Sequence, residues 1–121
     1  MAIKSVIGDK SLAFGKRIAK CYRYLRYSKR EQILSNQLLR SGTSIGANVR
    51  EGLYAQSRKD FINKLNIALK ESAETDYWLD IIHIAEYLND DDYNSLKKDN
   101  NELIRLLASI IKTAKSNDPT T

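Results

Sequence analysis

The sequence is poor in the residues that disulfide-linked and metal-binding proteins need. Among 121 residues there are one cysteine, one histidine and one proline. Cys21 has no partner for a disulfide bond within the chain, and His83 alone cannot supply the ligand cluster of a usual zinc or di-iron site. We therefore expect no disulfide scaffold and no metal site, and we predict no cofactor.

Long apolar runs are missing as well. No uninterrupted apolar run exceeds three residues, and residues 1–8 lack the apolar stretch of a secretory signal. Hydrophobic residues still make up 42% of the chain and charged residues 29%, which is typical of a globular protein rather than of a disordered one. We expect one soluble, cytoplasmic domain that does not contact a membrane.

The charges are distributed unevenly along the chain, whose net charge is +5. Residues 1–58 contain twelve lysines and arginines against three acidic residues, whereas residues 59–121 contain eight against twelve. Such halves favour a basic face for an anionic partner and an acidic face that limits unspecific contacts. Accidental clustering on a solvated surface is the alternative.

Apolar residues recur at helical spacing in four segments, and no strand-like alternation between hairpin turns is present. We predict helices over residues 9–28, 29–55, 57–88 and 90–116. Ser57 with Asp60, and Asn89 with the acidic run after it, are typical helix caps. The expected core stripes are Phe14, Ile18, Cys21 and Leu25; Leu34, Leu38, Ile45 and Val49; Phe61, Leu65, Ala68, Ser72, Thr75 and Leu79; and Leu96, Leu103, Leu107, Ile110 and Ala114. Short connections favour an all-α, antiparallel up-down four-helix bundle.

The third predicted helix has a second stripe outside its core stripe. A small bundle cannot cover both sides of one helix, so this stripe favours self-association into a ring or barrel. One wide apolar arc within a single core is the alternative. The predicted interface residues on this stripe are Ile67, Glu71, Glu74, Trp78 and Ile81.

The carboxylates of that stripe need a partner. We expect Glu71 or Glu74 to accept hydrogen bonds across helices from Arg40, Ser44 or Asn48, and so to fix the register at an interface. Metal binding and catalysis are less favoured, because a bundle metal site normally repeats a Glu-x-x-His motif.

Small residues are concentrated in the second predicted helix. Gly42 and Gly46 lie one turn apart, so that a partner helix can approach them closely, and we include both in the oligomer interface. A phosphate-binding loop is not favoured, since the glycines are not followed by Gly-Lys-Ser/Thr or preceded by a strand.

Three segments, Ile33 to Gly52, Ser57 to Ile62 and Lys64 to Leu79, resemble the four-helix-bundle proteins encoded in intervening sequences of bacterial 23S rRNA genes. The resemblance covers nearly the whole chain. It implies a non-enzymatic protein, without catalytic residues, whose protomers form a five-fold barrel with basic surfaces. The same family includes the accessory protein of diversity-generating retroelements, which implies nucleic-acid binding and partnership with a reverse transcriptase; a ribosome-related partner is also implied.

Cations form a row on the first predicted helix, on the side opposite its core stripe. Asp9 is the one acidic residue nearby, so salt bridges within the helix cannot account for the row. The predicted nucleic-acid-binding residues are Lys16, Lys20, Arg23, Arg26, Tyr27 and Arg30, extended by Arg40 and Arg50. They predict binding of RNA or DNA through phosphates, without base reading.

Two other functions are the alternatives to nucleic-acid binding. A protein-binding scaffold would leave the basic face incidental. A small RNase is not favoured, because no arginine precedes His83 within a few residues.

Overall fold

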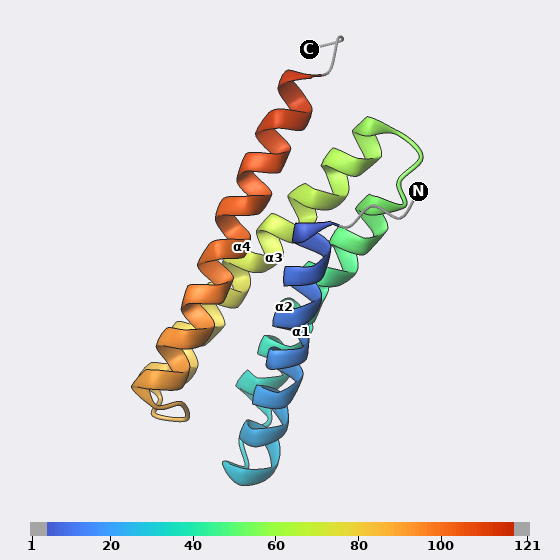
Figure 1. The fold of residues 1–121 in the computed structure, drawn as a ribbon. Helices are drawn as coiled ribbons and strands as arrows, with labels where there is room; N and C mark the ends of the chain where they lie inside the picture. Colours follow the sequence, from blue (N-terminus) through green and yellow to red (C-terminus); the bar gives the residue numbers. More distant parts are fainter. Residues whose placement is uncertain (1–4, 118–121) are drawn as a thin grey trace.

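The computed structural model describes residues 5–117. Four α-helices follow one another along the chain (Figure 1): α1 (Val6–Arg23), α2 (Ile33–Leu53), α3 (Arg58–Ile84) and α4 (Asp90–Ser116). A π-helical turn, η1 (Tyr24–Ser28), continues α1. Within residues 5–117 no strand occurs, and the prediction of an all-α fold of four helices is confirmed. Pro119 and the first half of the segment considered for a signal sequence lie outside the described residues.

Side-chain caps set where three of the helices begin. The hydroxyl of Ser57 accepts a hydrogen bond from the Asp60 backbone N–H at 3.0 Å, and the side chain of Asn89 accepts one from the Asp92 N–H at 2.8 Å. Both predicted caps are confirmed. Ser5 caps α1 in the same way at 2.9 Å from Gly8 N, so α1 begins at Val6 rather than at residue 9.

Two residues with left-handed backbone conformation lie where the sequence predicted helix. Arg30 has φ 57° and Glu86 has φ 67°, values that a right-handed helix cannot contain. Residues 29–32 therefore form a connection rather than the start of the second helix. α3 ends at Ile84 instead of continuing to residue 88.

Helices that follow one another along the chain pack side by side. The Lys10–Glu102 ion pair at 3.1 Å joins α1 to the middle of α4, the pair Ser41–Thr75 joins α2 to α3, and the pair Ser72–Asn100 joins α3 to α4. The α1–α2 and α3–α4 connections lie at the same end of the molecule, the lower end in Figure 1.

The core consists of the inward stripes of all four helices. Phe14, Ile18, Leu38, Leu65 and Leu107 are among its fully or nearly fully buried members. At the end of α4 the buried residue is Ile111 rather than the predicted Ile110. At this end of α4 the neighbouring helix is α3, because the Arg58 guanidinium donates to the carbonyl of Ala114 at 3.5 Å. The buried side of α4 therefore faces α3. Cys21 is only partly buried.

Buried polar groups at mid-bundle satisfy one another across helices. The Ser72 hydroxyl donates to the side-chain oxygen of Asn100 at 2.8 Å, and the Asn100 amide donates to the Ser72 carbonyl at 2.9 Å. Thr75 donates to the hydroxyl of Ser41 at 3.0 Å. Because a buried polar group without a partner is costly, these pairs specify the register of α2, α3 and α4.

The assignment of Gly42 to an oligomer interface is wrong. Gly42 is buried within one chain, where a Cβ atom would stand 2.8 Å from the side chain of Ile18. A Cβ on Gly46 would lie 3.2 Å from the carbonyl oxygen of Ser11. The partner helix that these glycines admit is therefore α1 of the same chain.

Candidate nucleic-acid interface

A stretch of basic residues without any acidic residue runs from Lys16 to Arg30. It contains seven lysines and arginines. Arg17 forms an ion pair with Asp99 of α4 at 2.7 Å. Among the described residues, none of the other six cations has a carboxylate partner: Lys16, Lys20, Arg23, Arg26, Lys29 and Arg30. We term Lys20, Arg23, Tyr24, Arg26, Tyr27, Lys29 and Arg30 the basic tip.

The nearest acidic residue along the chain, Glu31, does not neutralise the basic tip. Its side chain is buried and accepts hydrogen bonds from the backbone N–H groups of Leu34, at 2.5 and 3.0 Å, and Ser35, at 3.2 Å. A carboxylate in this position satisfies free donors at the positive end of α2. The negative charge of Glu31 thus stabilises the N-terminus of α2.

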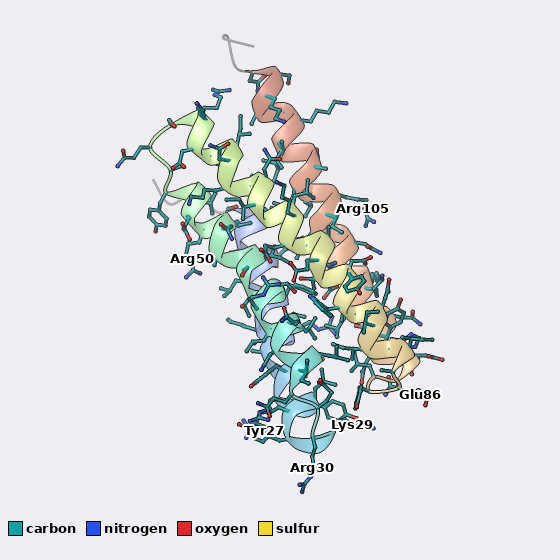
Figure 2. The ribbon with its side chains drawn as sticks, turned by 180° about the vertical axis from the view of Figure 1, so that it is seen from behind. Tyr27, Lys29, Arg30, Arg50, Glu86 and Arg105 are labelled. Carbon is teal, nitrogen blue, oxygen red and sulfur yellow. The ribbon has the colours of Figure 1, made fainter. Side chains whose placement is uncertain are left out.

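The π-helical turn η1 exposes two aromatic side chains of the basic tip. Lys29 N–H donates to the Tyr24 carbonyl at 3.2 Å, which closes the wider turn. Leu25 remains buried, whereas Tyr24 and Tyr27 are 43% and 70% exposed. Figure 2 shows Tyr27, Lys29 and Arg30 together at the end of the molecule. π-turns inside helices occur often at functional sites.

Arg30 lies in the connection and not on the helical face where it was predicted. It still joins the basic tip, because Arg26, Tyr27 and Arg30 line one surface hollow of about 390 Å³. Arg26 donates to the side chain of Gln32 at 2.5 Å, and its guanidinium carbon lies 5.9 Å from the centroid of the Tyr27 ring. Arginine and tyrosine are therefore held next to each other.

The acidic α3–α4 connection borders the basic tip on one side. Tyr24 and Lys29 line a hollow of about 590 Å³ together with Glu86 and Asp90. Asp90 lies 2.7 Å from the Nε2 atom of His83, whose ring stacks on Tyr93 with centroids 3.8 Å apart. Opposite charges thus stand beside each other at this end, and the basic tip faces solvent on its remaining sides.

Three predicted nucleic-acid-binding residues are not part of the basic tip: Lys16, Arg40 and Arg50. Arg40 forms ion pairs with Glu71, at 3.3 Å, and with Glu74 of α3. Its charge is therefore compensated within the chain, and we no longer include it among phosphate-binding residues. Arg50 is exposed but lies farther along the molecule (Figure 2).

Arg50 and Lys16 flank a groove between α1 and α2 of about 670 Å³. Small residues line it because the two helices approach closely there. Its walls also carry the exposed apolar side chains of Leu12, Leu53 and Tyr54.

The expected hydrogen bonds to the α3 carboxylates are partly observed. Arg40 reaches both Glu71 and Glu74, but Ser44 and Asn48 donate to carbonyl groups of their own helix, at 2.6 and 2.9 Å. These carboxylates thus connect α2 and α3 of one chain. Their assignment to an interface between subunits is not needed to explain them.

The apolar part of the predicted interface remains accessible on α3. Ile67 is 41% exposed, while Trp78 and Ile81 are partly buried. The indole N–H of Trp78 donates to Glu74 at 2.8 Å. Tyr77 and Ile84, which were not among the predicted interface residues, are 55% and 77% exposed. Their i, i+7 spacing was a signal for a neighbouring stripe.

Basic residues on α4 were also missed. Lys98, Arg105 and Lys112 recur every seven residues, are exposed and have no carboxylate partner among the described residues. The spacing was visible, but the negative charge of residues 59–121 as a whole concealed it. Lys29 was missed at the basic tip as well.

The clearest ionisable cluster connects α3 and α4. Lys97 pairs with Asp76 at 2.6 Å and Asp80 at 2.7 Å, and the Tyr93 hydroxyl donates to Asp80 at 2.5 Å. Partial burial alone lowers the pKa of Lys97, but hydrogen bonds to the two carboxylates outweigh it and raise that pKa. Hydrogen bonds from Lys97 and Tyr93 lower the pKa of Asp80. The cluster is a structural ion-pair network.

Cys21 is a poor nucleophile at neutral pH. Burial, together with the negative charge of Asp92, raises the pKa of its thiol to about 11, and the thiolate is the reactive form. In the described part of the chain no group of three His, Cys, Asp or Glu residues is placed to hold a metal ion. Within residues 5–117 no helix combines the length and apolar character needed to cross a membrane.

Four packed helices with a basic tip place the chain among the all-α helical-bundle proteins. The family of 23S rRNA-intervening sequence proteins matches residues 4–109, and the chain belongs to this family. The family description names no catalysed reaction.

A solved structure supports the same assignment. It is the crystal structure of a protein of unknown function from the S23 ribosomal protein family of Bacteroides thetaiotaomicron, with 54% sequence identity and a TM-score of 0.87. The match covers 88% of this chain and 96% of that chain. A comparison with curated proteins gives no match. A relation to the retroelement accessory protein stays a prediction.

Proposed function

We propose that the chain is a non-enzymatic, homo-oligomeric accessory protein that binds RNA or DNA through phosphate contacts at the basic tip. The observation that carries this proposal is the stretch from Lys16 to Arg30, with six cations that have no carboxylate partner among the described residues. Like charges held together repel one another, and a polyanion relieves this repulsion. Phosphate binding also releases condensed counterions, which supplies the driving force.

The side chains of the basic tip suit backbone contacts. Arg23, Arg26 and Arg30 present planar guanidinium forks that match phosphate oxygens, and Lys20 and Lys29 act as point charges. Nothing in this set reads base edges in a groove. The binding is therefore expected to depend on salt and to have little sequence preference.

The proposal includes self-association of antiparallel up-down bundles into a ring or barrel through the outer side of α3. Ile67, Tyr77 and Ile84 leave apolar surface exposed there, and a second copy of the chain would cover it. Five copies are expected from the family resemblance. A ring would present several basic tips to one nucleic-acid strand and so raise the overall affinity.

The family description supports RNA as the first ligand to test. It names proteins of intervening sequences in 23S rRNA. A ribosome-related protein and a reverse transcriptase are the protein partners to test after the nucleic acid.

The experiment is a salt titration with labelled RNA and DNA, single- and double-stranded. Wild type should bind with a log–log slope of about −0.7 to −0.9 per phosphate contact. The double substitution Lys20→Glu with Arg23→Glu should weaken binding and make the dependence of affinity on salt less steep, because phosphate contacts are lost. The matched control is Arg105→Glu with Lys112→Glu on α4, which changes the net charge by the same amount. It should leave the affinity and its salt dependence nearly unchanged.

The groove between α1 and α2 favours a second candidate, a protein-binding scaffold. Leu12, Leu53 and Tyr54 give this groove exposed apolar walls. Absence of nucleic-acid binding by wild type at low salt would contradict the first proposal and leave the scaffold.

A further inference from the structure

Tyr27 borders two separate surface hollows that are lined by arginine side chains. Tyr22, Arg23 and Tyr27 line one hollow of about 540 Å³, and Arg26, Tyr27 and Arg30 line the other, of about 390 Å³. The side chain of Tyr27 is 70% exposed. An aromatic ring thus stands in solvent between guanidinium groups.

The arginines around Tyr27 are free to receive a ligand. None of Arg23, Arg26 and Arg30 has a carboxylate partner among residues 5–117. Arg26 is oriented by its hydrogen bond to Gln32 at 2.5 Å and lies 5.9 Å from the centre of the Tyr27 ring. Each hollow therefore combines an aromatic wall with a positive charge.

This combination fits an unpaired nucleotide better than a duplex. The face of a base stacks well on an aromatic ring or on the plane of a guanidinium group. In a duplex the neighbouring base pairs already cover these faces, so that the protein reaches phosphates and groove edges only. An exposed ring next to unpaired cations gains stacking energy only from a strand whose bases are accessible.

The backbone around Tyr27 holds it in this position. The π-helical turn η1 keeps Leu25 buried while Tyr27 faces solvent, and the left-handed conformation of Arg30, with φ 57°, ends the helix directly after this turn. A non-glycine residue in that conformation is strained. Such strain is concentrated at functional sites.

We propose that the basic tip binds unpaired strands of RNA or DNA, with Tyr27 stacking on an exposed base in one of its two hollows. Arg23 contacts the phosphates on one side of Tyr27, and Arg26 and Arg30 contact those on the other. The inference rests on the proposed function and adds to it a preference for single strands over duplex.

The test compares Tyr27→Ala with Tyr27→Phe. The probes are a 12-nucleotide oligouridine, the matching oligothymidine and a blunt 12-base-pair duplex, with affinities measured by fluorescence anisotropy. Tyr27→Ala should weaken single-strand binding by roughly 5- to 150-fold. Tyr27→Phe keeps the ring and should stay within about twofold of wild type. Both variants should leave duplex affinity unchanged, and the ribose and deoxyribose strands separate RNA from DNA.

A second readout reports stacking directly. A 2-aminopurine within the single strand should lose fluorescence on binding to wild type and Tyr27→Phe, and lose less on binding to Tyr27→Ala. Circular dichroism checks the fold of each variant, which should be intact because Tyr27 is largely exposed.

Different results overturn different statements. If Tyr27→Ala binds and quenches like wild type while Lys20→Glu with Arg23→Glu weakens binding, the stacking inference is wrong and the proposed function stands. Equal wild-type affinity for single strand and duplex also overturns the preference. If wild type binds none of the probes at low salt, both proposals fail.

Discussion

Two glycines of the bundle occupy contrasting surroundings although both lie inside helices. A Cβ atom on Gly42 would stand 2.8 Å from two side-chain carbons of the buried residue Ile18, whereas a Cβ on Gly15 would meet nothing within 4 Å. Gly42→Ala should therefore lower the free energy of unfolding by about 1 kcal/mol, because overpacking of about 1–3 kcal/mol exceeds the helix-propensity gain of about 1 kcal/mol. Urea unfolding followed by circular dichroism measures the change.

Gly15→Ala is the matched control. It makes the same chemical change in open space and should raise the free energy of unfolding by about 0.5–1 kcal/mol through helix propensity alone. A stabilising effect of both substitutions would show that α1 and α2 are farther apart than described.

Asp80 should make stability depend on pH in acid. Its pKa is lowered by hydrogen bonds from Lys97 and Tyr93, so the unfolded state binds protons that the folded state does not. The contribution of Asp80 is complete above the unfolded pKa of about 4 and is lost as pH falls through the lower folded pKa. Wild type should be more stable than Asp80→Asn at pH 7, and this difference should disappear in strong acid.

The control for that series is Glu86→Gln, since Glu86 is exposed and has no ion-pair partner among the described residues. Its effect on the free energy of unfolding should be small, because the substitution removes no ion pair. Unfolding curves from pH 2 to pH 7 provide the comparison, and a constant difference for Asp80→Asn over this range would contradict the account.

The pairing of single residues was only partly predictable from sequence. The contacts of Arg40 with Glu71 and Glu74 were expected, but Arg17 has the same chemistry as Arg23, and only the placement of α4 shows that Asp99 pairs with Arg17. Spacing within one helix cannot reveal which carboxylate a neighbouring helix brings near. The core residues were more predictable, because burial depends chiefly on helical periodicity.

At the scale of elements, the connection between α1 and α2 combines a strained backbone with exposed cations. Arg30→Gly removes the cost of a left-handed arginine and should raise the free energy of unfolding by about 0.5–1 kcal/mol, after the entropic cost of glycine. The same change should weaken nucleic-acid binding, because it removes a phosphate contact. Urea unfolding and a binding titration on the same preparation measure both effects.

Glu86→Gly provides a matched comparison at the other left-handed residue, with φ 67°. It should stabilise the fold by a similar amount and should not weaken nucleic-acid binding. If Arg30→Gly leaves the affinity unchanged, Arg30 does not contact phosphate.

Helix boundaries set by a capping side chain were predicted better than boundaries set by backbone conformation. Ser57 and Asn89 have side chains that accept hydrogen bonds from the first turn, and this chemistry is visible in the sequence. Arg30 and Glu86 end helices through backbone conformation, and neither residue type signals a left-handed conformation as glycine or asparagine would. The predicted second helix accordingly began too early.

At the scale of the whole molecule, the net charge of a sequence segment does not predict where charged side chains lie on the surface. The half of the sequence that is acidic overall contributes the exposed basic residues Lys98, Arg105 and Lys112 of α4. Packing places Glu102 and Asp99 of the same helix towards Lys10 and Arg17 of α1. Within residues 5–117, exposed lysine and arginine side chains therefore occur along α4 as well as at the basic tip, and the charge counts of the two sequence halves anticipated only the basic tip.

Self-association is tested by placing a charge on the outer side of α3. Ile67→Glu should dissociate the assembly into 13.8 kDa chains, because the Ile67 side chain is 41% exposed in the single chain and would be covered by a second copy. Val6→Glu makes a similar change at a 61% exposed residue of α1 and should leave the assembly intact. Native mass spectrometry measures both, and a wild type that is monomeric at high micromolar concentration contradicts the proposal.

Locating the bound nucleic acid on the protein is the strongest test of binding at the basic tip. A single-stranded RNA carrying 4-thiouridine is bound to wild type at low salt and crosslinked with light, and the crosslinked residues are identified by mass spectrometry. The account predicts crosslinks at the basic tip, with Tyr27 foremost, and their loss when salt is raised. Crosslinks confined to the outer side of α4 or to the groove between α1 and α2, or none at all, would contradict it.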